Sequence, residues 1–432
     1  MGLGRAGLVT FDSQRRNYLL MFLDNMLFTS AMTFLSINTV LTYFLNHLGA
    51  TTFEISLANA LVSIGAVISQ PVFVKKLVSL SYKLHTFVRI LLTQRLFMLL
   101  FVATVPLLAP RHPHWMIVWF LVAWGIFNFF VGSYSPFYMS VFAKMIAVSD
   151  RGRLRGYSAS AGNGIALIAA YLIGVILKEV AYPFNYTLLL GLGALLLLLD
   201  ALDFALMKEQ PDQVIQVEVN YFRYFRDIPA VLRRNKAFAR MVLAFSLMVI
   251  AQVGLVYYSL YAIRVYHAQA VDIAWFTATG VFVNILGNIG FGILADRFSH
   301  RLVLEYSAVL GALAGLAALS IHHLAGVYIA FALSNLCLSG YNLSSSILVV
   351  ENTTLDQVPM HISVNVMVTL LVSSAVTLLT GALVSQVSFL SIFVLVLLAG
   401  ALSSWVMHTL PIGTSGGTLT LQKAKAQKNS RP

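Results

Sequence analysis

The stretch that divides this chain is residues 208–240, KEQPDQVIQVEVNYFRYFRDIPAVLRRNKAFAR. It is polar and basic, whereas the sequence on either side consists mostly of apolar runs long enough to cross a bilayer as helices. Six such runs precede it and six follow it. The twelve runs lie near 18–46, 53–74, 86–108, 115–143, 157–177, 185–207, 241–264, 272–294, 302–321, 324–349, 363–384 and 388–410. This order predicts an all-α membrane protein with twelve transmembrane helices in two six-helix bundles.

The composition agrees with a membrane protein. Of the 432 residues, 59% are hydrophobic and 10% are charged, and the mean hydropathy is +0.83. Soluble domains have about 45–50% apolar and about 25% charged residues. These figures exclude a water-soluble enzyme of one to three domains, and the single cysteine, Cys337, excludes a disulfide scaffold.

The basic residues predict the orientation. If the N-terminus lies inside, 24 of the 28 Lys and Arg residues fall on the inner side, three (Arg111, Lys178 and Arg264) fall outside, and Arg95 lies within a run. This asymmetry predicts a multi-pass protein of the cell membrane with both termini in the cytoplasm. It accounts for the net charge of +12 and predicts attraction to anionic lipid on the inner face, with no nucleic-acid partner.

The predicted segments follow from these two patterns. They are a cytoplasmic N-terminus (1–17), an N-terminal bundle (18–207), a cytoplasmic basic linker (208–240), a C-terminal bundle (241–410) and a disordered basic tail (411–432). The two halves share local text, because 50–76 and 270–297 each have an acidic residue near the outer end, small residues throughout and a basic inner end. Two pseudo-symmetric bundles with the cargo path at their interface are a recurrent transporter plan.

Three stretches carry a family resemblance. Residues 292–301, GILADRFSHR, look like the signature G-x-L-a-D-R-x-x-x-R of the major facilitator superfamily (MFS). Residues 150–156, DRGRLRG, are similar to that family's R-G-R-x-x-G stretch, and 221–241 resembles its linker. The corresponding first-half stretch at 70–76, QPVFVKK, lacks the Asp-Arg pair, so the subfamily is left unassigned.

The resemblance implies a conformational latch around Asp296. In the family, this carboxylate faces the N-terminus of a helix in the opposite bundle, where the helix dipole favours negative charge. The residues that would complete the gate are Arg297, Arg301, Arg153, Arg155 and Glu305. Ordinary positive-inside residues in a tight loop are the alternative for the arginines.

The resemblance also implies that the runs 18–46, 115–143, 241–264 and 324–349 line a central cavity. Polar and aromatic residues recur along these runs, in part at helical spacing, which fits such a face. The candidate substrate-binding residues are Asn25, Thr29, Ser36, Trp124, Asn128, Gln252, Tyr257, Tyr258, Asn335, Ser339 and Asn342. Packing between helices through small and polar residues is the alternative.

Two charges within the runs are candidates for ion coupling. Asp24 lies about 9 Å and Arg95 about 14 Å from the predicted inner edge, at about 1.5 Å per residue. Ionisable residues at such depth are functional candidates by default. The alternative for Asp24 is a structural pair with Arg95, and the alternative for Arg95 alone is that its long side chain extends to the inner membrane surface. We expect Asp200 and Asp203 to pair with Lys208 or with arginines of the linker.

The chain contains no nucleophile elbow, no zinc-protease motif and no phosphate-binding loop, and its ten histidines are scattered. We therefore expect no enzyme activity, no cofactor and no metal. The sequence predicts a monomeric secondary active transporter that moves a small solute by alternating access, with protons as the expected coupling ion. Export is one option for its direction, and uniport is left open. The alternatives are a non-transporting sensor on a transporter scaffold and, less favoured, a membrane-embedded transferase.

Overall fold

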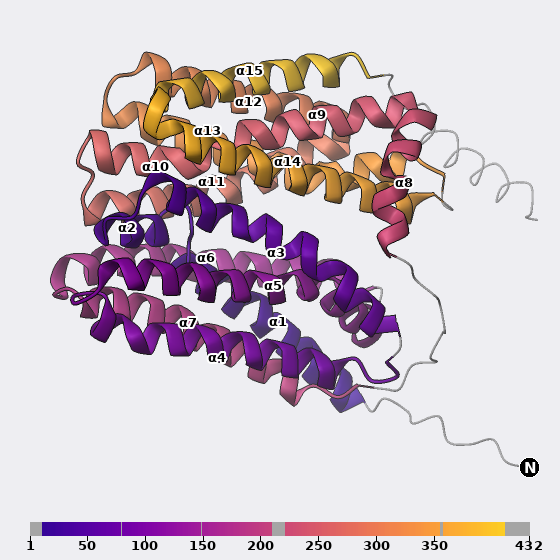
Figure 1. The fold of residues 1–432 in the computed structure, drawn as a ribbon. Helices are drawn as coiled ribbons and strands as arrows, with labels where there is room; N and C mark the ends of the chain where they lie inside the picture. Colours follow the sequence, from indigo (N-terminus) through magenta and orange to yellow (C-terminus); the bar gives the residue numbers. More distant parts are fainter. Residues whose placement is uncertain (1–10, 79, 148, 210–220, 355–356, 411–432) are drawn as a thin grey trace, which may run out of the picture. The chain divides into compact units, whose positions relative to one another are not determined.

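A computed structural model of the chain describes residues 11–78, 80–147, 149–209, 221–354 and 357–410, and their regular structure is α-helical (Figure 1). The helices are α1 (Phe11–Phe34), α2 (Val40–His47), α3 (Thr52–Val78), α4 (Leu84–Leu108), α5 (Pro113–Met145), α6 (Arg151–Glu179), α7 (Phe184–Leu206), α8 (Tyr221–Arg234), α9 (Lys236–Gln252), α10 (Gly254–Val265), α11 (Ala270–Arg297), α12 (His300–Ser320), α13 (Leu324–Glu351), α14 (Val358–Val387) and α15 (Phe389–His408).

The predicted all-α membrane fold is confirmed. Among the described residues, eleven helical segments are long and apolar enough to cross a membrane, and they correspond to eleven of the twelve predicted runs. The run 241–264 is formed by α9 and α10 together. The predicted tail, 411–432, lies outside the described residues.

The first run, 18–46, differs from the continuous helix that was predicted. The structure has α1 up to Phe34 and α2 from Val40, with a turn between them. In that turn the carbonyl of Ser36 accepts hydrogen bonds from the amides of Thr39 (3.3 Å) and Leu41 (3.0 Å). The hydropathy of the run cannot reveal such a break, because an average over the run does not register where the helix is interrupted.

The chain forms two compact units. Unit 1 comprises Met1–Val219, Ser259–Phe282 and Thr377–Ser385, and unit 2 comprises Asn220–Tyr258, Val283–Val376 and Gln386–Pro432. Unit 1 therefore includes parts of α10, α11 and α14 from the second half of the chain. The division into bundles 18–207 and 241–410 stays a prediction.

Unit 1 is built from close helix pairs. Helix α3 packs on α5, α4 packs on α5 and α7, and α1 packs on α6 and α7 (Figure 1). The approach of α3 to α5 depends on Gly65, where a Cβ atom would lie 2.6 Å from the backbone carbon of Asn128. Phe87 of α4 contacts Phe137 of α5 and Phe204 of α7, with ring centroids 5.7 and 4.9 Å apart. Because α7 packs on both α1 and α4, the charged residues of these helices, Asp24, Arg95 and Asp200, can lie close together.

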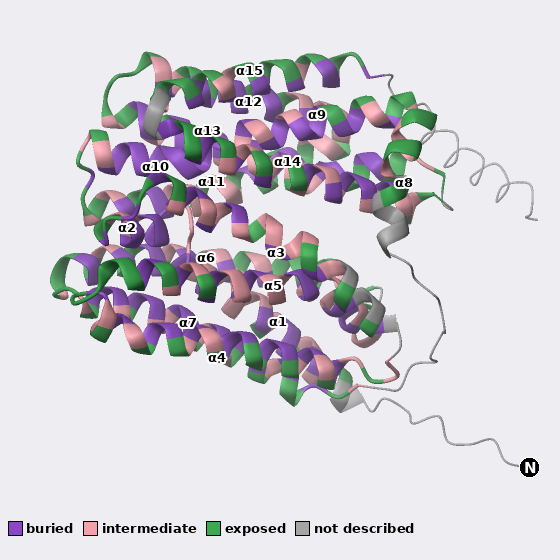
Figure 2. Cartoon of the chain, in the orientation of Figure 1, coloured by how far each residue is buried: buried purple, intermediate pink, exposed green. Residues whose placement is uncertain are grey.

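The outward faces of the helices are apolar. On α4, Leu92, Leu96, Leu100 and Leu107 are exposed at steps of four, four and seven residues, which places them on one face. Figure 2 shows that exposed residues recur along α4. A soluble protein does not expose a continuous stripe of this kind without a partner. The stripe suits contact with lipid.

Unit 2 also relies on glycines at its helix contacts. Helix α12 packs on α13 and α15, and α15 packs on α9. A Cβ atom at Gly315 of α12 would lie 2.6 Å from the backbone nitrogen of Leu397 in α15, and one at Gly400 would lie 2.4 Å from that of Ala312. The backbones of α12 and α15 can therefore meet only because these residues have no side chain.

Glu209, in the segment after α7, binds the start of α4. Its carboxylate accepts hydrogen bonds from the amides of Lys83 (2.9 Å) and Leu84 (2.8 Å) and pairs with Lys144 at 3.0 Å. The first amides of a helix have no partner within the helix, so a carboxylate there satisfies them. Asn17 of α1 and Lys208 exchange two further hydrogen bonds beside it.

Candidate functional site

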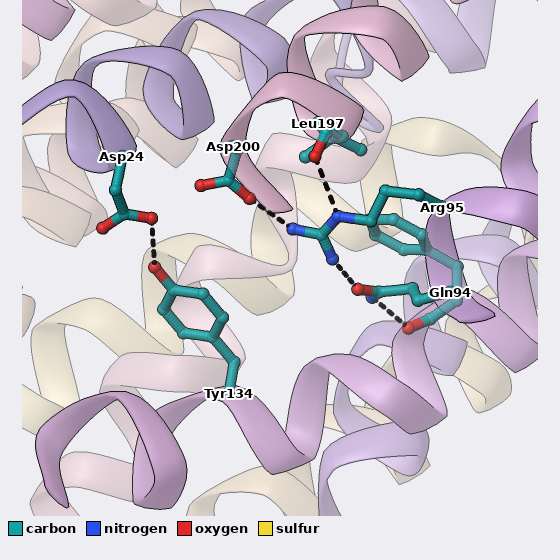
Figure 3. Close-up of polar contacts among 7 residues, drawn as sticks. Asp24, Gln94, Arg95, Tyr134, Leu197 and Asp200 are labelled. Atoms are coloured by element: carbon teal, nitrogen blue, oxygen red, sulfur yellow. Dashed lines mark hydrogen bonds and ion pairs between the residues drawn. The ribbon is translucent and has the colours of Figure 1, made fainter. Parts of the chain in front are cut away.

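A buried ion pair joins α4 and α7 in unit 1. The Nη2 atom of Arg95, on α4, is 2.5 Å from Oδ2 of Asp200, on α7, and the two side chains are 1% and 0% exposed (Figure 3). The prediction that Asp200 pairs with Lys208 or a linker arginine was wrong, because its ion-pair partner among the described residues is Arg95. A buried charge is costly unless it is paired and hydrogen-bonded, so each of these residues depends on the other.

The remaining nitrogens of Arg95 also donate. Its Nε atom donates to the carbonyl of Leu197 at 3.1 Å, and Nη1 donates to Oε1 of Gln94. Gln94 in turn donates to the carbonyl of Phe127, on α5, at 2.7 Å. The guanidinium therefore links α4, α5 and α7 through groups that hold it in one orientation (Figure 3).

Asp24, on α1, is the third charged residue of this cluster. It is fully buried, and Oδ1 accepts a hydrogen bond of 3.3 Å from the hydroxyl of Tyr134. Its carboxyl group faces that of Asp200 (Figure 3). Oδ2 of Asp24 and Oδ1 of Asp200 are buried and accept no hydrogen bond from a donor among the described residues. The structure thus brings Asp24 and Arg95 into one cluster, with Asp200 between them (Figure 3). The coupling role of Asp24 and Arg95 stays a prediction.

Asp200 could have been identified from depth alone. It lies seven residues from the end of the predicted run 185–207, which corresponds to about 10 Å. Asp24 and Arg95 lie at about 9 and 14 Å by the same measure. Two acidic residues and one basic residue at a similar depth can form a charge cluster if their helices are neighbours. The sequence does not show which helices are neighbours.

The candidate cavity residues of unit 1 fall into two groups, which differ in how far the side chains are buried. Trp124 and Asn128 are buried. The indole of Trp124 donates a hydrogen bond to the carbonyl of Ala58 at 3.0 Å, and the amide of Asn128 donates one to the carbonyl of Trp124 at 2.8 Å. Asn25 and Thr29 are half-buried on α1, and Thr29 donates to Oδ1 of Asn25 at 3.3 Å. Ser36 lies in the turn between α1 and α2.

The candidate residues of unit 2 show a similar division. Tyr257 and Tyr258 are fully buried, and Tyr258 stacks on Phe393 at 5.3 Å. Gln252 is half-buried at the end of α9. Asn335 donates to its own helix, Ser339 donates to Asn288, and Asn342 is exposed; these three lie on one face of α13.

Three of the candidate gate residues of unit 2, Arg297, Arg301 and Glu305, line a cavity of about 960 Å³. Asp296 and Arg297 are at the end of α11. Arg301 donates to the carbonyls of Met407 (3.0 Å) and His408, and Glu305 lies 2.8 Å from Nδ1 of His408. Arg301 and Glu305 therefore contact the end of α15.

Two further gate candidates, Arg153 and Arg155, lie on α6 in unit 1 and are exposed. The guanidinium carbon of Arg155 lies 4.8 Å from the ring centroid of Phe142, and its Nη2 atom is 3.0 Å from Sδ of Met139. The predicted latch of Asp296 with these arginines stays a prediction.

A second set of contacts in unit 1 was not predicted. Arg264, at the end of α10, donates to Oδ1 of Asn46 (3.0 Å), the carbonyl of Ala50 (2.7 Å) and Oγ1 of Thr52 (2.5 Å). Nearby, the hydroxyl groups of Thr277 and Thr39 are 2.9 Å apart. Arg264 is one of only three basic residues at the predicted outer end, and this scarcity was the available signal.

With helices of this length, apolar outward faces and a buried charge cluster, the chain has the architecture of a multi-pass membrane transporter. Residues 23–274 match the family model described as Major Facilitator Superfamily, and the chain belongs to this family. No curated protein sequence matches the chain.

Solved structures with the same fold cover nearly the whole chain. A mutant of the nucleoside transporter NupG is similar with a TM-score of 0.69 and 12% identity, over 92% of this chain and 99% of that one. A D-xylose–proton symporter is similar with a TM-score of 0.68 and 15% identity, over 94% and 99%. A mutant of the E. coli fucose:proton symporter, FucP, has a TM-score of 0.60 and 17% identity, over 93% and 100%. At these identities the likeness shows the fold.

Proposed function

We propose that this chain is a secondary active transporter that moves a small solute by alternating access and couples the movement to protons. The observation that carries this proposal is the presence of two buried carboxyl groups, Asp24 and Asp200, beside one guanidinium, Arg95. The three residues come from α1, α7 and α4, so a movement of these helices changes their mutual contact.

The charge of the cluster supports a one-proton site. With both carboxyl groups ionised, the cluster has a net charge of −1, and with one proton bound it is neutral. Burial away from water disfavours a net charge. Oδ2 of Asp24 and Oδ1 of Asp200 are buried without a hydrogen-bond partner among the described residues, so each is a candidate atom to hold this proton. Proton release therefore requires water to reach the cluster, which links protonation to conformation.

The similar structures support the same proposal. Two of them are described as proton symporters, one for D-xylose and one for fucose, and a third as a nucleoside transporter. The chain shares their fold over most of its length. The proposal of proton coupling in this chain rests on Asp24, Asp200 and Arg95, and not on the functions of these similar proteins.

The rest of the proposal concerns the ends of the helices. Asp296 with Arg297, Arg301, Arg153, Arg155 and Glu305 would form a latch that opens in each cycle.

The protein would lie in the cell membrane as a monomer, with both termini in the cytoplasm. Import and export are distinguished by the direction in which a pH gradient drives accumulation.

Proteoliposomes test the coupling. A thermal-shift screen identifies a solute that binds, since ligands of the folded form raise stability. We expect an imposed pH gradient to drive accumulation of that solute by the wild type. Asp24→Asn should abolish accumulation and retain exchange of labelled for unlabelled solute. Asp203→Asn, on α7 but outside the hydrogen bonds of the cluster, is the matched control.

Two results would overturn this proposal. Accumulation that is independent of the gradient in the wild type would indicate uniport. Solute binding without flux in any direction would favour the sensor alternative.

A further inference from the structure

A row of amide side chains lies on α11 and α13 within unit 2. The Nδ2 atom of Asn288 donates to Oδ1 of Asn284 at 2.8 Å, and the hydroxyl of Ser339 donates to Oδ1 of Asn288 at 3.1 Å. Asn335 and Asn342 precede and follow Ser339 by four and three residues, so they share its face of α13. We call Asn284, Asn288, Asn335, Ser339 and Asn342 the amide row.

The two helices meet closely at this row. A Cβ atom at Gly287 of α11 would lie 2.7 Å from the hydroxyl oxygen of Ser339 on α13. Because residue 287 has no side chain, the next residue, Asn288, reaches Ser339. The contact fixes the orientation of the Asn288 amide.

Helix α11 exposes two faces of different chemistry. Leu286, Ile289 and Ile293 are each more than half exposed and lie on one side of the helix. Asn288 is exposed and Asn284 half-buried, and they lie roughly opposite at 3.6 residues per turn. The apolar face suits lipid, whereas amides in the hydrocarbon region are costly unless they face water or polar groups. The amide face therefore borders a polar path.

The row carries no charge. Neither 273–295 on α11 nor 324–350 on α13 contains Asp, Glu, Lys, Arg or His. An ionised solute on this surface would lose hydration without gaining a counter-charge, which costs free energy. A side-chain amide has two donors and an acceptor oxygen with two lone pairs, and the contacts within the row use only part of this capacity.

We infer that the amide row recognises the hydroxyl groups of an uncharged, polyhydroxylated solute. A hydroxyl both donates and accepts, so it matches an amide that presents both functions. Neighbouring hydroxyls on one solute can engage Asn284 and Asn288 together, because these residues lie one turn apart. This inference rests on the proposed function and names the chemical class of its cargo.

Binding measurements on the purified full-length protein test the inference. The neutral probes are D-glucose, myo-inositol and uridine, and the charged probes are citrate, L-glutamate and choline, measured by calorimetry and thermal shift. We expect at least one neutral probe to bind and the charged probes not to bind. Asn288→Ala and Asn284→Ala should each weaken that binding by about tenfold, which corresponds to one hydrogen bond.

Matched variants keep the test falsifiable. Ile289→Ala removes a side chain from the opposite face of α11 and should leave affinity unchanged. Melting temperatures without solute check that each variant is folded. The inference is overturned if no neutral probe binds, if charged probes bind instead, or if both amide variants bind as the wild type does.

Flux separates this inference from the proposed function. Proton-driven transport of a charged solute, unaffected in the amide variants, would leave the transporter standing and remove the amide row as its recognition surface. Neutral binding that depends on Asn288 but is never accompanied by flux would support the surface and overturn the transporter.

Discussion

The Nη2 atom of Arg264 lies 2.7 Å from the carbonyl oxygen of Ala50, a residue 214 positions earlier in the chain. The same guanidinium also donates to Asn46 and Thr52, so one side chain holds the turn between α2 and α3 against the end of α10. These contacts lie within unit 1.

Removal of the Arg264 side chain should loosen this end of unit 1. Ala50 is 3% exposed, so a cysteine placed there by Ala50→Cys should react slowly with maleimide in an otherwise wild-type protein. We expect Arg264→Ala to accelerate labelling about tenfold or more, because hydrogen bonds to a charged group contribute about 1.5–3 kcal/mol each. Protein without the Ala50→Cys change reports the background from the buried Cys337. Equal labelling rates with and without the Arg264 side chain would contradict the conclusion that it holds the turn between α2 and α3 against α10.

Loss of one partner of the Arg95–Asp200 pair should destabilise unit 1 strongly. Arg95→Met leaves the buried carboxylate of Asp200 without its counter-charge, and breaking such a pair costs about 3–5 kcal/mol. We expect the double variant Arg95→Met, Asp200→Leu to recover most of this loss. Unfolding in detergent by temperature or denaturant measures the difference. A double variant less stable than Arg95→Met would show that the pair is not the cause.

Glu209 should contribute to stability through the two amides that it satisfies at the start of α4. Glu209→Ala leaves the amides of Lys83 and Leu84 and the ammonium of Lys144 without this acceptor, so we expect a loss of about 1–3 kcal/mol. Glu179 is the control, since it faces Lys178 at 3.4 Å with both side chains about two-thirds exposed. Exposed pairs contribute little, so Glu179→Ala should shift the melting temperature much less.

Gly315 and Gly290 provide a matched pair of helix glycines. An added Cβ at Gly315 would lie 2.6 Å from backbone of α15, whereas one at Gly290 meets no heavy atom of the described chain within 4 Å. We expect Gly315→Ala to lower stability by about 1–3 kcal/mol through overpacking. Gly290→Ala should be neutral or stabilising, because alanine favours a helix over glycine. Similar melting temperatures for the two variants would mean that α12 and α15 can move apart at little cost.

The fold followed from the sequence far more completely than the site did. Eleven predicted runs are helices that can cross a membrane, whereas the run 18–46 is interrupted between α1 and α2. At the site, the depth of Asp24 and Arg95 was informative, but their common neighbour Asp200 was assigned to the wrong partners. Asn284 and Asn288 were missed because their helix was not among those expected to line a cavity.

The sequence alone determined the order and extent of the apolar runs, because transfer into a bilayer depends on side chains summed over a local window. The tertiary structure decided which polar groups meet: Arg95 with Asp200 across 105 positions, and Asn288 with Ser339 across 51. Such pairs depend on the rotation of each helix and on the glycines that let backbones approach. A window of hydropathy averages over all faces of a helix, so it contains no information on which face meets which neighbour.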